Sequence, residues 1–131
     1  MSKINDEMKR VLENSIWVLA TADKQGIPNA VPIHWGKVLR DDKLMMVNNF
    51  MKKTLDNISV NPNVSVSVWK EKTGFQFKGK ASVETSGSNF EAGRAMVLEA
   101  NPKANPKGVV IVDLQAIYLT TPGADAGKKV D

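Results

Sequence analysis

Hydrophobic and polar residues alternate along several short stretches of the chain, a pattern typical of half-buried β-strands. In residues 64–69, Val64, Val66 and Val68 alternate with serines and are followed by Trp69. Because successive side chains of a strand point to opposite faces, the three valines share one buried face. Apolar or β-branched stretches predict five more strands, at residues 16–22, 28–38, 44–47, 75–85 and 109–119.

Short polar turns between these strands predict hairpins. Residues 23–26 (DKQG) follow the first strand, and residues 72–74 (KTG) follow the strand at 64–69. Helical spacing of apolar residues instead predicts three short helices, at residues 6–14, 52–61 and 89–99. Hairpins without a regular alternation of strand and helix favour an antiparallel barrel over a parallel sheet. We therefore expect a mainly β fold, a six-stranded antiparallel barrel with short helices.

Length and composition limit the kinds of site that the chain can hold. With 131 residues, 42% of them hydrophobic, we expect one domain over residues 1–131, with flexible ends at 1–5 and 122–131. The absence of cysteine excludes disulfides, thiolate metal sites and a cysteine nucleophile. The longest apolar stretch, at residues 16–20, is far shorter than the roughly 20 residues of a membrane-spanning helix, and no signal-peptide pattern opens the chain. We therefore expect a cytoplasmic protein.

The chain is basic, with a net charge of +4 and a pI of about 9.4. A solvated basic surface accounts for this charge, and so does an anionic partner. A small nucleic-acid-binding barrel is one such alternative, because exposed aromatic residues on strands can stack on bases. The three Trp, one Tyr and four Phe residues do not lie in a Lys/Arg-rich repeat, and we expect no nucleic acid as partner.

Motifs for metal binding and hydrolysis are missing from the sequence. The lone histidine, His34, cannot build a multi-histidine metal site, so we expect no metal. There is no nucleophile-elbow pattern, no phosphate-loop motif and no glycine-rich dinucleotide fingerprint. No residue is identified as catalytic.

One segment is suited to binding a phosphate group. In residues 48–54 (NNFMKKT) a buried strand ends, the chain turns, and Lys52, Lys53 and Thr54 open a helix. Unpaired N–H groups and the positive end of the macrodipole favour an anion there. The lysines and the threonine hydroxyl add hydrogen-bond donors. Lysine pairs at helix starts are also common on solvated surfaces. This segment alone therefore does not decide between a phosphate-binding site and an ordinary solvated helix start.

The order and spacing of several stretches match one known family. They are residues 26–35, residues 44–49, Lys53-Thr54 with Asn57, residues 61–64 (NPNV), and Gly74-Phe75 with residues 77–81. Together they resemble the pyridoxamine phosphate oxidase-like split-barrel flavoproteins, with the small FMN-binding proteins as the nearest likeness. The likeness covers roughly residues 10 to 85. Residues 55–62 contain no arginine, unlike the arginine-rich site of pyridoxamine phosphate oxidase itself, which argues against vitamin B6 oxidation.

The resemblance implies a split β-barrel that binds FMN. The implied cofactor-binding residues are the phosphate pair Lys53 and Thr54 with Lys52 beside it, Pro32, Ile33 and His34 on the adjoining strand, and Val47, Asn48 and Asn49 facing the isoalloxazine. Gln76 is a further candidate for contact with the cofactor, because strand positions beside Phe75 and Phe77 alternate in direction. A structural histidine is an equal alternative for His34, and a solvent-facing glutamine for Gln76. Trp35 and Trp69 either stack near the flavin or fill the core or an interface.

The resemblance also implies a homodimer with the cofactor at the subunit interface, where Trp17 or Tyr118 would complete the neighbour's site. Two functions remain open. One is a flavin-dependent oxidoreductase that exchanges a hydride with a nicotinamide or another small electron donor or acceptor. The other is a non-catalytic FMN carrier or electron-transfer module. A deazaflavin or haem in place of FMN is a further alternative, because split barrels of this family hold different cofactors.

Overall fold

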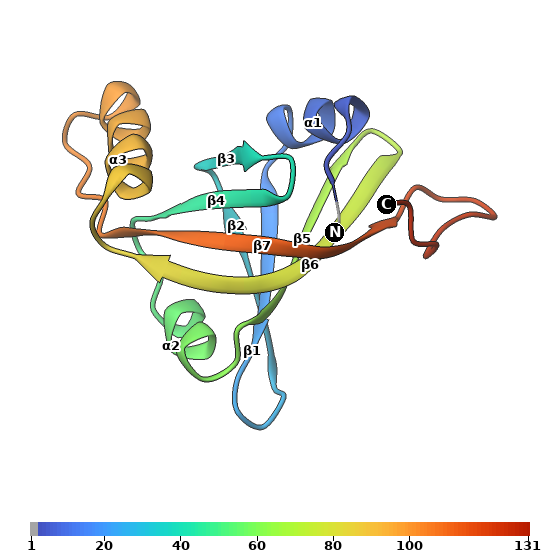
Figure 1. The fold of residues 1–131 in the computed structure, drawn as a ribbon, viewed down its shortest axis with the longest axis horizontal. Helices are drawn as coiled ribbons and strands as arrows, with labels where there is room; N and C mark the ends of the chain where they lie inside the picture. The colour runs from blue at the N-terminus through green and yellow to red at the C-terminus, as the bar shows by residue number, and fades with distance from the viewer. Residues whose placement is uncertain (1–2) are drawn as a thin grey trace.

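Seven strands form one antiparallel sheet in the computed structural model, which describes residues 3–131. The strands are β1 Trp17–Ala22, β2 Pro28–Ile33, β3 Gly36–Arg40, β4 Lys43–Asn48, β5 Asn63–Lys70, β6 Thr73–Glu84 and β7 Gly108–Leu119. Their order in the sheet is β2-β1-β5-β6-β7-β4-β3. The long strands β6 and β7 curve across the molecule, and the sheet curls around its inner face (Figure 1). The predicted mainly β split-barrel architecture is thereby confirmed.

The strand count differs from the prediction because the stretch at residues 28–38 is two strands. β2 pairs with β1 as far as Ile33, and β3 begins at Gly36, where it pairs with Met46 of β4. The chain bends between them and crosses from one edge of the sheet to the other. At the bend, a Cβ atom on residue 36 would lie 2.7 Å from the Trp17 ring, so the close approach requires glycine. The apolar pattern runs on through the bend and therefore does not show it.

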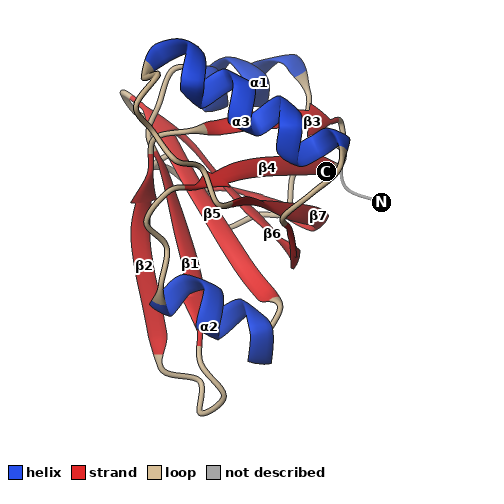
Figure 2. Cartoon of the chain, turned by 90° about the vertical axis from the view of Figure 1, so that its left-hand side faces the viewer, coloured by secondary structure: helices blue, strands red, loops and turns tan. Residues whose placement is uncertain are grey.

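All three predicted helices are present, as α1 Asp6–Glu13, α2 Lys53–Val60 and α3 Ser88–Ala100. The side chain of Asn5 caps α1 by accepting the Met8 N–H at 2.9 Å. Helices α1 and α3 lie near one end of the sheet, and α2 lies at the opposite end (Figure 2). This leaves α2 alone beside the ends of β1 and β2.

The apolar residues form two clusters, one on each side of β4. Inside the curled sheet, Leu19, Val66, Phe77 and Ile117 are fully buried. Outside it, α3 covers a second cluster made of Met45, Val47, Val97, Val109 and Ile111. Both faces of β4 are therefore buried, which explains why its sequence is a continuous apolar run instead of an alternating one.

The two ends predicted to be flexible have defined paths where they are described. Residues 1–2 lie outside the described residues, while Ile4 is buried and donates its N–H to the Asp41 carbonyl at 2.6 Å. At the other end, the Leu119 N–H donates to the Lys128 carbonyl at 2.9 Å, so the chain folds back on β7. Flexibility of these ends stays a prediction.

Among the described residues, no helix is both long enough and apolar enough to cross a membrane. The cytoplasmic location expected from the sequence stays a prediction.

Candidate functional site

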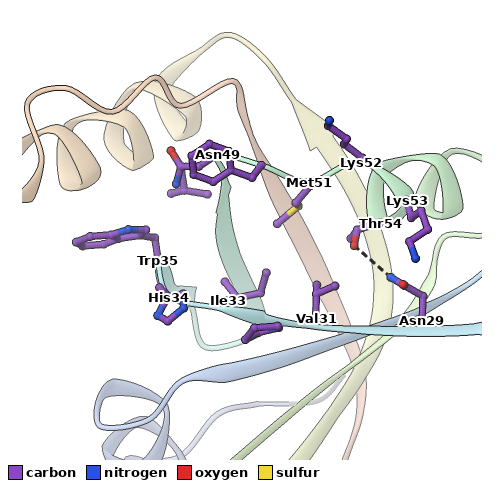
Figure 3. Close-up of a pocket in the computed structure, with 13 residues that line it drawn as sticks. Asn29, Val31, Ile33, His34, Trp35, Asn49, Met51, Lys52, Lys53 and Thr54 are labelled. Atoms are coloured by element: carbon purple, nitrogen blue, oxygen red, sulfur yellow. Dashed lines mark hydrogen bonds between the residues drawn. The ribbon is translucent and has the colours of Figure 1, made fainter.

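A cavity of about 530 Å³ lies between β2, the end of β4 and the first turn of α2 (Figure 3). Two short segments of the chain line it: Asn29, Val31, Pro32, Ile33, His34, Trp35 from the first, and Val47, Asn49, Phe50, Met51, Lys52, Lys53, Thr54 from the second. Its volume is within the roughly 300 to 1,000 Å³ of small-molecule and cofactor sites. The lining is polar at the two ends and apolar between them, where Val31, Ile33 and Met51 lie.

The first turn of α2 forms one end of the cavity, which we call the phosphate end: Asn29, Lys53 and Thr54. Lys52 occupies the N-cap position, and no described side chain caps the helix with a hydrogen bond. N–H groups of a first helical turn have no partner within the helix, and the macrodipole is positive there. Lys53 points toward Asn29 and Thr54, whereas Lys52 points away from them (Figure 3). This end therefore gathers hydrogen-bond donors and one ammonium group.

A network of buried side chains and the half-buried Asn29 holds α2 against the ends of β1 and β2. Asn29 Nδ2 lies 3.3 Å from Thr54 Oγ1 and 3.4 Å from Thr21 Oγ1, and Asn57 Nδ2 donates to Thr21 Oγ1 at 2.9 Å. Thr54, Thr21 and Asn57 are 2%, 4% and 9% exposed. Thr54 is thus fixed in place, because a hydrogen-bonded network from two strands and its own helix surrounds it.

Sequence reasoning missed Asn29 and Thr21, although one signal pointed to Thr21. In β1, Trp17 and Leu19 face the core, and Thr21 continues the same inward row. A polar residue at the end of an otherwise apolar inward row needs a hydrogen-bond partner. Its partners lie in β2 and α2, which the local sequence does not reveal.

The opposite end of the cavity, which we call the ring end, consists of His34, Trp35, Asn49 and Phe50. Asn49 Oδ1 is buried, and no described residue donates a hydrogen bond to it. Trp35 packs against the apolar cluster under α3, whereas Phe50 is 91% exposed at the rim. The ring end thus brings together a side-chain amide, an anchored indole and an exposed phenyl ring.

Eight of the ten predicted cofactor-binding residues line this cavity, and Asn48 and Gln76 do not. Asn48 is buried, and its Oδ1 accepts the Met51 N–H at 2.8 Å, so it shapes the loop between β4 and α2. Gln76 lies between the buried Phe75 and Phe77 and points to the outer face of β6, opposite Ser67 and Tyr118. Asn29, Val31, Phe50 and Met51 also line the cavity but were not among the ten predicted residues, although Phe50 and Met51 lie in the predicted phosphate-binding segment 48–54.

Within residues 3–131, no group of three or more acidic or histidine side chains lies close enough to hold a metal ion. The polar side chains that line the cavity are those of Asn29, His34, Asn49, Lys52, Lys53 and Thr54. Their polar groups are the hydroxyl, amides, ammonium groups and imidazole named above.

Comparison with known proteins gives consistent matches along almost the whole chain. A family model described as pyridoxamine 5′-phosphate oxidase matches residues 4–121. An uncharacterized protein from Methanocaldococcus jannaschii is 36% identical over 131 residues, which cover 98% of this chain and 88% of that protein.

Solved structures are similar as well. The crystal structure of HupZ from Group A Streptococcus superposes with a TM-score of 0.83 at 28% identity, covering 95% of this chain and 99% of that one. An FMN-binding protein from Syntrophomonas wolfei has a TM-score of 0.74 at 15% identity, covering 82% of this chain and 78% of that one. The second likeness shows a shared fold alone.

Proposed function

Because the chain belongs to the pyridoxamine 5′-phosphate oxidase family, we propose that the cavity between β2, β4 and α2 binds FMN. The observation that carries this proposal is the polarity of the cavity. Its phosphate end gathers donors and positive charge, and amide and aromatic groups lie at the other end of the same cavity. A structural neighbour, the protein from Syntrophomonas wolfei, is described as FMN-binding, which supports the choice of cofactor.

The phosphate end fits the terminal phosphate of FMN. Phosphate carries about −1.5 to −2 charges near neutral pH and only accepts hydrogen bonds when fully ionised. Lys53 supplies the ammonium group, the Thr54 hydroxyl supplies a donor, and the first-turn N–H groups of α2 supply more. A charge-assisted hydrogen bond of this kind contributes about 1.5 to 3 kcal/mol.

The ring end fits the isoalloxazine. Asn49 lines this end, and we assign its side-chain amide to hydrogen bonding with the ring N3–H or a ring carbonyl oxygen. The Trp35 indole and the Val47 side chain add apolar surface beside it, and both are anchored by packing against the cluster under α3. We assign to these residues the orientation of the ring.

Bound FMN would supply hydride and one-electron chemistry at its ring. The chain's own residues bind the cofactor and orient it. Two activities fit this arrangement, a flavin-dependent oxidoreductase and an FMN carrier or electron-transfer module. Of the two we propose the oxidoreductase, because His34 and Phe50 at the ring end lie beside open solvent, where a second small molecule can approach.

Vitamin B6 oxidation is not part of the proposal. Pyridoxamine phosphate is itself a phosphate ester, so its oxidase must bind a second phosphate group near the ring. Among residues 3–131, Lys52 and Lys53 are the only Lys or Arg residues that line the cavity, and both lie at the start of α2. The described residues of one subunit therefore place no Lys or Arg at the ring end for a second phosphate group.

We further propose that the protein works as a homodimer with the cofactor at the interface. Neither β1 nor β2 carries a charged residue, and the exposed apolar residues Ile16 (52%) and Trp69 (56%) flank their outer face. Surfaces of this kind are typical of protein interfaces. Pro32 is exposed on that face and also lines the cavity, so a second copy docked there would reach the cofactor.

In this dimer, we expect Gln76 to lie near the cofactor of the partner subunit. It is opposite Ser67 in the β5–β6 pairing, and Ser67 is opposite Val18 in the β1–β5 pairing, so all three lie along one row of the sheet. Gln76 faces away from its own cavity. In the dimer it would approach the partner's cavity from the outer face.

The identity of the cofactor is tested on the protein as purified. We expect a yellow protein whose released cofactor has the chromatographic retention and mass of FMN. Release of FAD, a deazaflavin or haem instead would contradict the choice of FMN.

The proposed oxidoreductase activity is tested by anaerobic addition of NADH or NADPH to the FMN complex. Loss of the oxidised flavin absorbance with either donor supports the oxidoreductase. No loss with either donor favours the carrier.

A further inference from the structure

We propose that Asn29 makes the phosphate end of the cavity selective for a phosphate monoester, by holding the Thr54 hydroxyl as a hydrogen-bond donor. The inference rests on the proposed FMN binding and adds a positioning residue to it. Asn29 acts through Thr54, and its expected effect is on the preference for FMN over riboflavin, the same flavin without phosphate.

The direction of the hydrogen bond between the two residues follows from their chemistry. Asn29 Nδ2 lies 3.3 Å from Thr54 Oγ1 (Figure 3). An amide nitrogen donates and does not accept, so the threonine oxygen must be the acceptor. The single hydrogen of the Thr54 hydroxyl then remains for another acceptor. Thr54 lines the cavity, so a ligand there can take it.

The rest of the network keeps this direction from reversing. Asn29 Nδ2 also lies 3.4 Å from Thr21 Oγ1, and Asn57 Nδ2 donates to the same oxygen at 2.9 Å. Thr21 therefore accepts from two amide groups, one in β2 and one in α2. With Thr21 and Thr54 both almost fully buried, water cannot replace these bonds without opening the junction between α2 and the strands.

The consequence is a phosphate end at which donors outnumber acceptors, since the Asn29 side-chain oxygen is the one acceptor among its described side chains once Thr54 donates to the ligand. Lys53, the Thr54 hydroxyl and the first-turn N–H groups of α2 all donate. An ionised phosphate, which only accepts, satisfies them. A terminal hydroxyl, as in riboflavin, brings no charge and leaves donors of the site without acceptors. Sites built to pair with one polar group reject ligands that lack it, because their own buried groups stay unpaired.

The replacement Asn29→Asp tests the direction of the bond with almost no change in shape. A carboxylate only accepts, so the Thr54 hydrogen turns toward residue 29 and is lost to the phosphate. The dissociation constant for FMN should rise about 30-fold or more, which at about 1.4 kcal/mol per tenfold is about 2 kcal/mol and fits the loss of one charge-assisted hydrogen bond. The dissociation constant for riboflavin should change less than about threefold, because riboflavin has no phosphate for the lost donor.

A negative charge at residue 29 also repels phosphate directly, so a double-mutant cycle with Thr54→Val separates the two effects. If Asn29 acts through Thr54, the FMN penalty of Asn29→Asp is at least about fivefold smaller in the Thr54→Val background than in the native one. Equal penalties in the two backgrounds would overturn the inference. Gln25→Glu, the same amide-to-carboxylate exchange in the exposed β1–β2 turn, is the control for net charge and should leave both dissociation constants unchanged.

Asn29→Ala keeps the inference testable if Asn29→Asp does not fold. It removes the donor without adding a charge, and we expect the FMN constant to rise about three- to tenfold with riboflavin unchanged. An unchanged ratio of the two constants would overturn the inference. If the native protein binds neither flavin, the proposed function fails first. If the native protein binds FMN tightly but the variants keep the native ratio of the riboflavin and FMN dissociation constants, the inference about Asn29 is wrong and the proposed FMN binding still stands.

Discussion

The side-chain nitrogen of Asn29 lies 3.3 Å from the hydroxyl oxygen of Thr54, although the two residues are 25 positions apart in the chain. The contact joins the start of β2 to the first turn of α2, and it brings the two segments that line the cavity together at one end. Everything proposed for the phosphate end depends on this junction. The predictions below test the junction, the cavity beside it and the outer face of the sheet.

Lys53→Ala should weaken FMN binding by about 1 to 3 kcal/mol, because it removes one charge-assisted hydrogen bond to the phosphate. Lys52→Ala is the matched control. Lys52 points away from Asn29 and Thr54, so its removal should have the smaller effect. The dissociation constants of the two variants for FMN are measured by quenching of flavin fluorescence, at low salt and again at high salt. An unchanged constant in a folded Lys53→Ala variant refutes the role of Lys53.

Thr54→Ser should bind FMN within about threefold of the native protein, whereas Thr54→Val should bind it about tenfold or more weakly. Serine keeps the hydroxyl and loses a methyl group, while valine keeps the shape and loses the donor. Because Thr54 is buried, thermal unfolding must accompany the titration. Equal loss of FMN binding in both variants, without a loss of stability, would show that the Thr54 hydroxyl does not contribute to FMN binding.

Gly36→Ala should lower the free energy of unfolding by about 1 to 3 kcal/mol, as overpacking of a core commonly does. Three ring atoms of Trp17 lie 2.7 to 2.8 Å from the position of the added Cβ. Chemical denaturation measures the loss. In a Trp17→Phe background the same replacement should cost less, because the ring is smaller; an equal cost in both backgrounds would mean that the ring is not the obstacle.

How far the sequence predicts this structure depends on whether the interaction is local. The valine alternation at residues 64–69 and the helical spacing at residues 6–14 each describe one element, and both elements are present. Eight residues of the cavity were also predictable, since they lie in two continuous segments. The bend at His34 and Trp35 was not, because the apolar pattern continues through it. The Thr21 and Asn29 network was not either, since its partners lie in other elements.

The case of Gln76 shows what alternation alone can settle. Phe75 and Phe77 face the core, so Gln76 between them must face outward. The predicted contact of Gln76 with the cofactor agrees with this outward orientation only if the cofactor belongs to a second copy. The sequence contained both observations but no information on how two copies meet.

Trp69→Glu should convert the proposed dimer to a monomer, because it places a charge on the apolar outer face. It should also weaken FMN binding, since the partner's Gln76 is then removed from the site. Sedimentation velocity with and without FMN measures the first effect. Val83→Glu is the control, an equally drastic change at an exposed apolar position of β6. A native protein that is monomeric at micromolar concentration with FMN present contradicts the dimer.

The central claim, that the cavity binds FMN, is tested most directly by titrating FMN into the purified protein freed of any cofactor. Flavin fluorescence should be quenched with a dissociation constant in the micromolar range or lower, and riboflavin should bind at least about tenfold more weakly because it lacks the phosphate. Equal affinity for the two flavins would contradict the proposal that the phosphate end binds the phosphate group of FMN. No quenching by either flavin would contradict the account of the cavity as a flavin site.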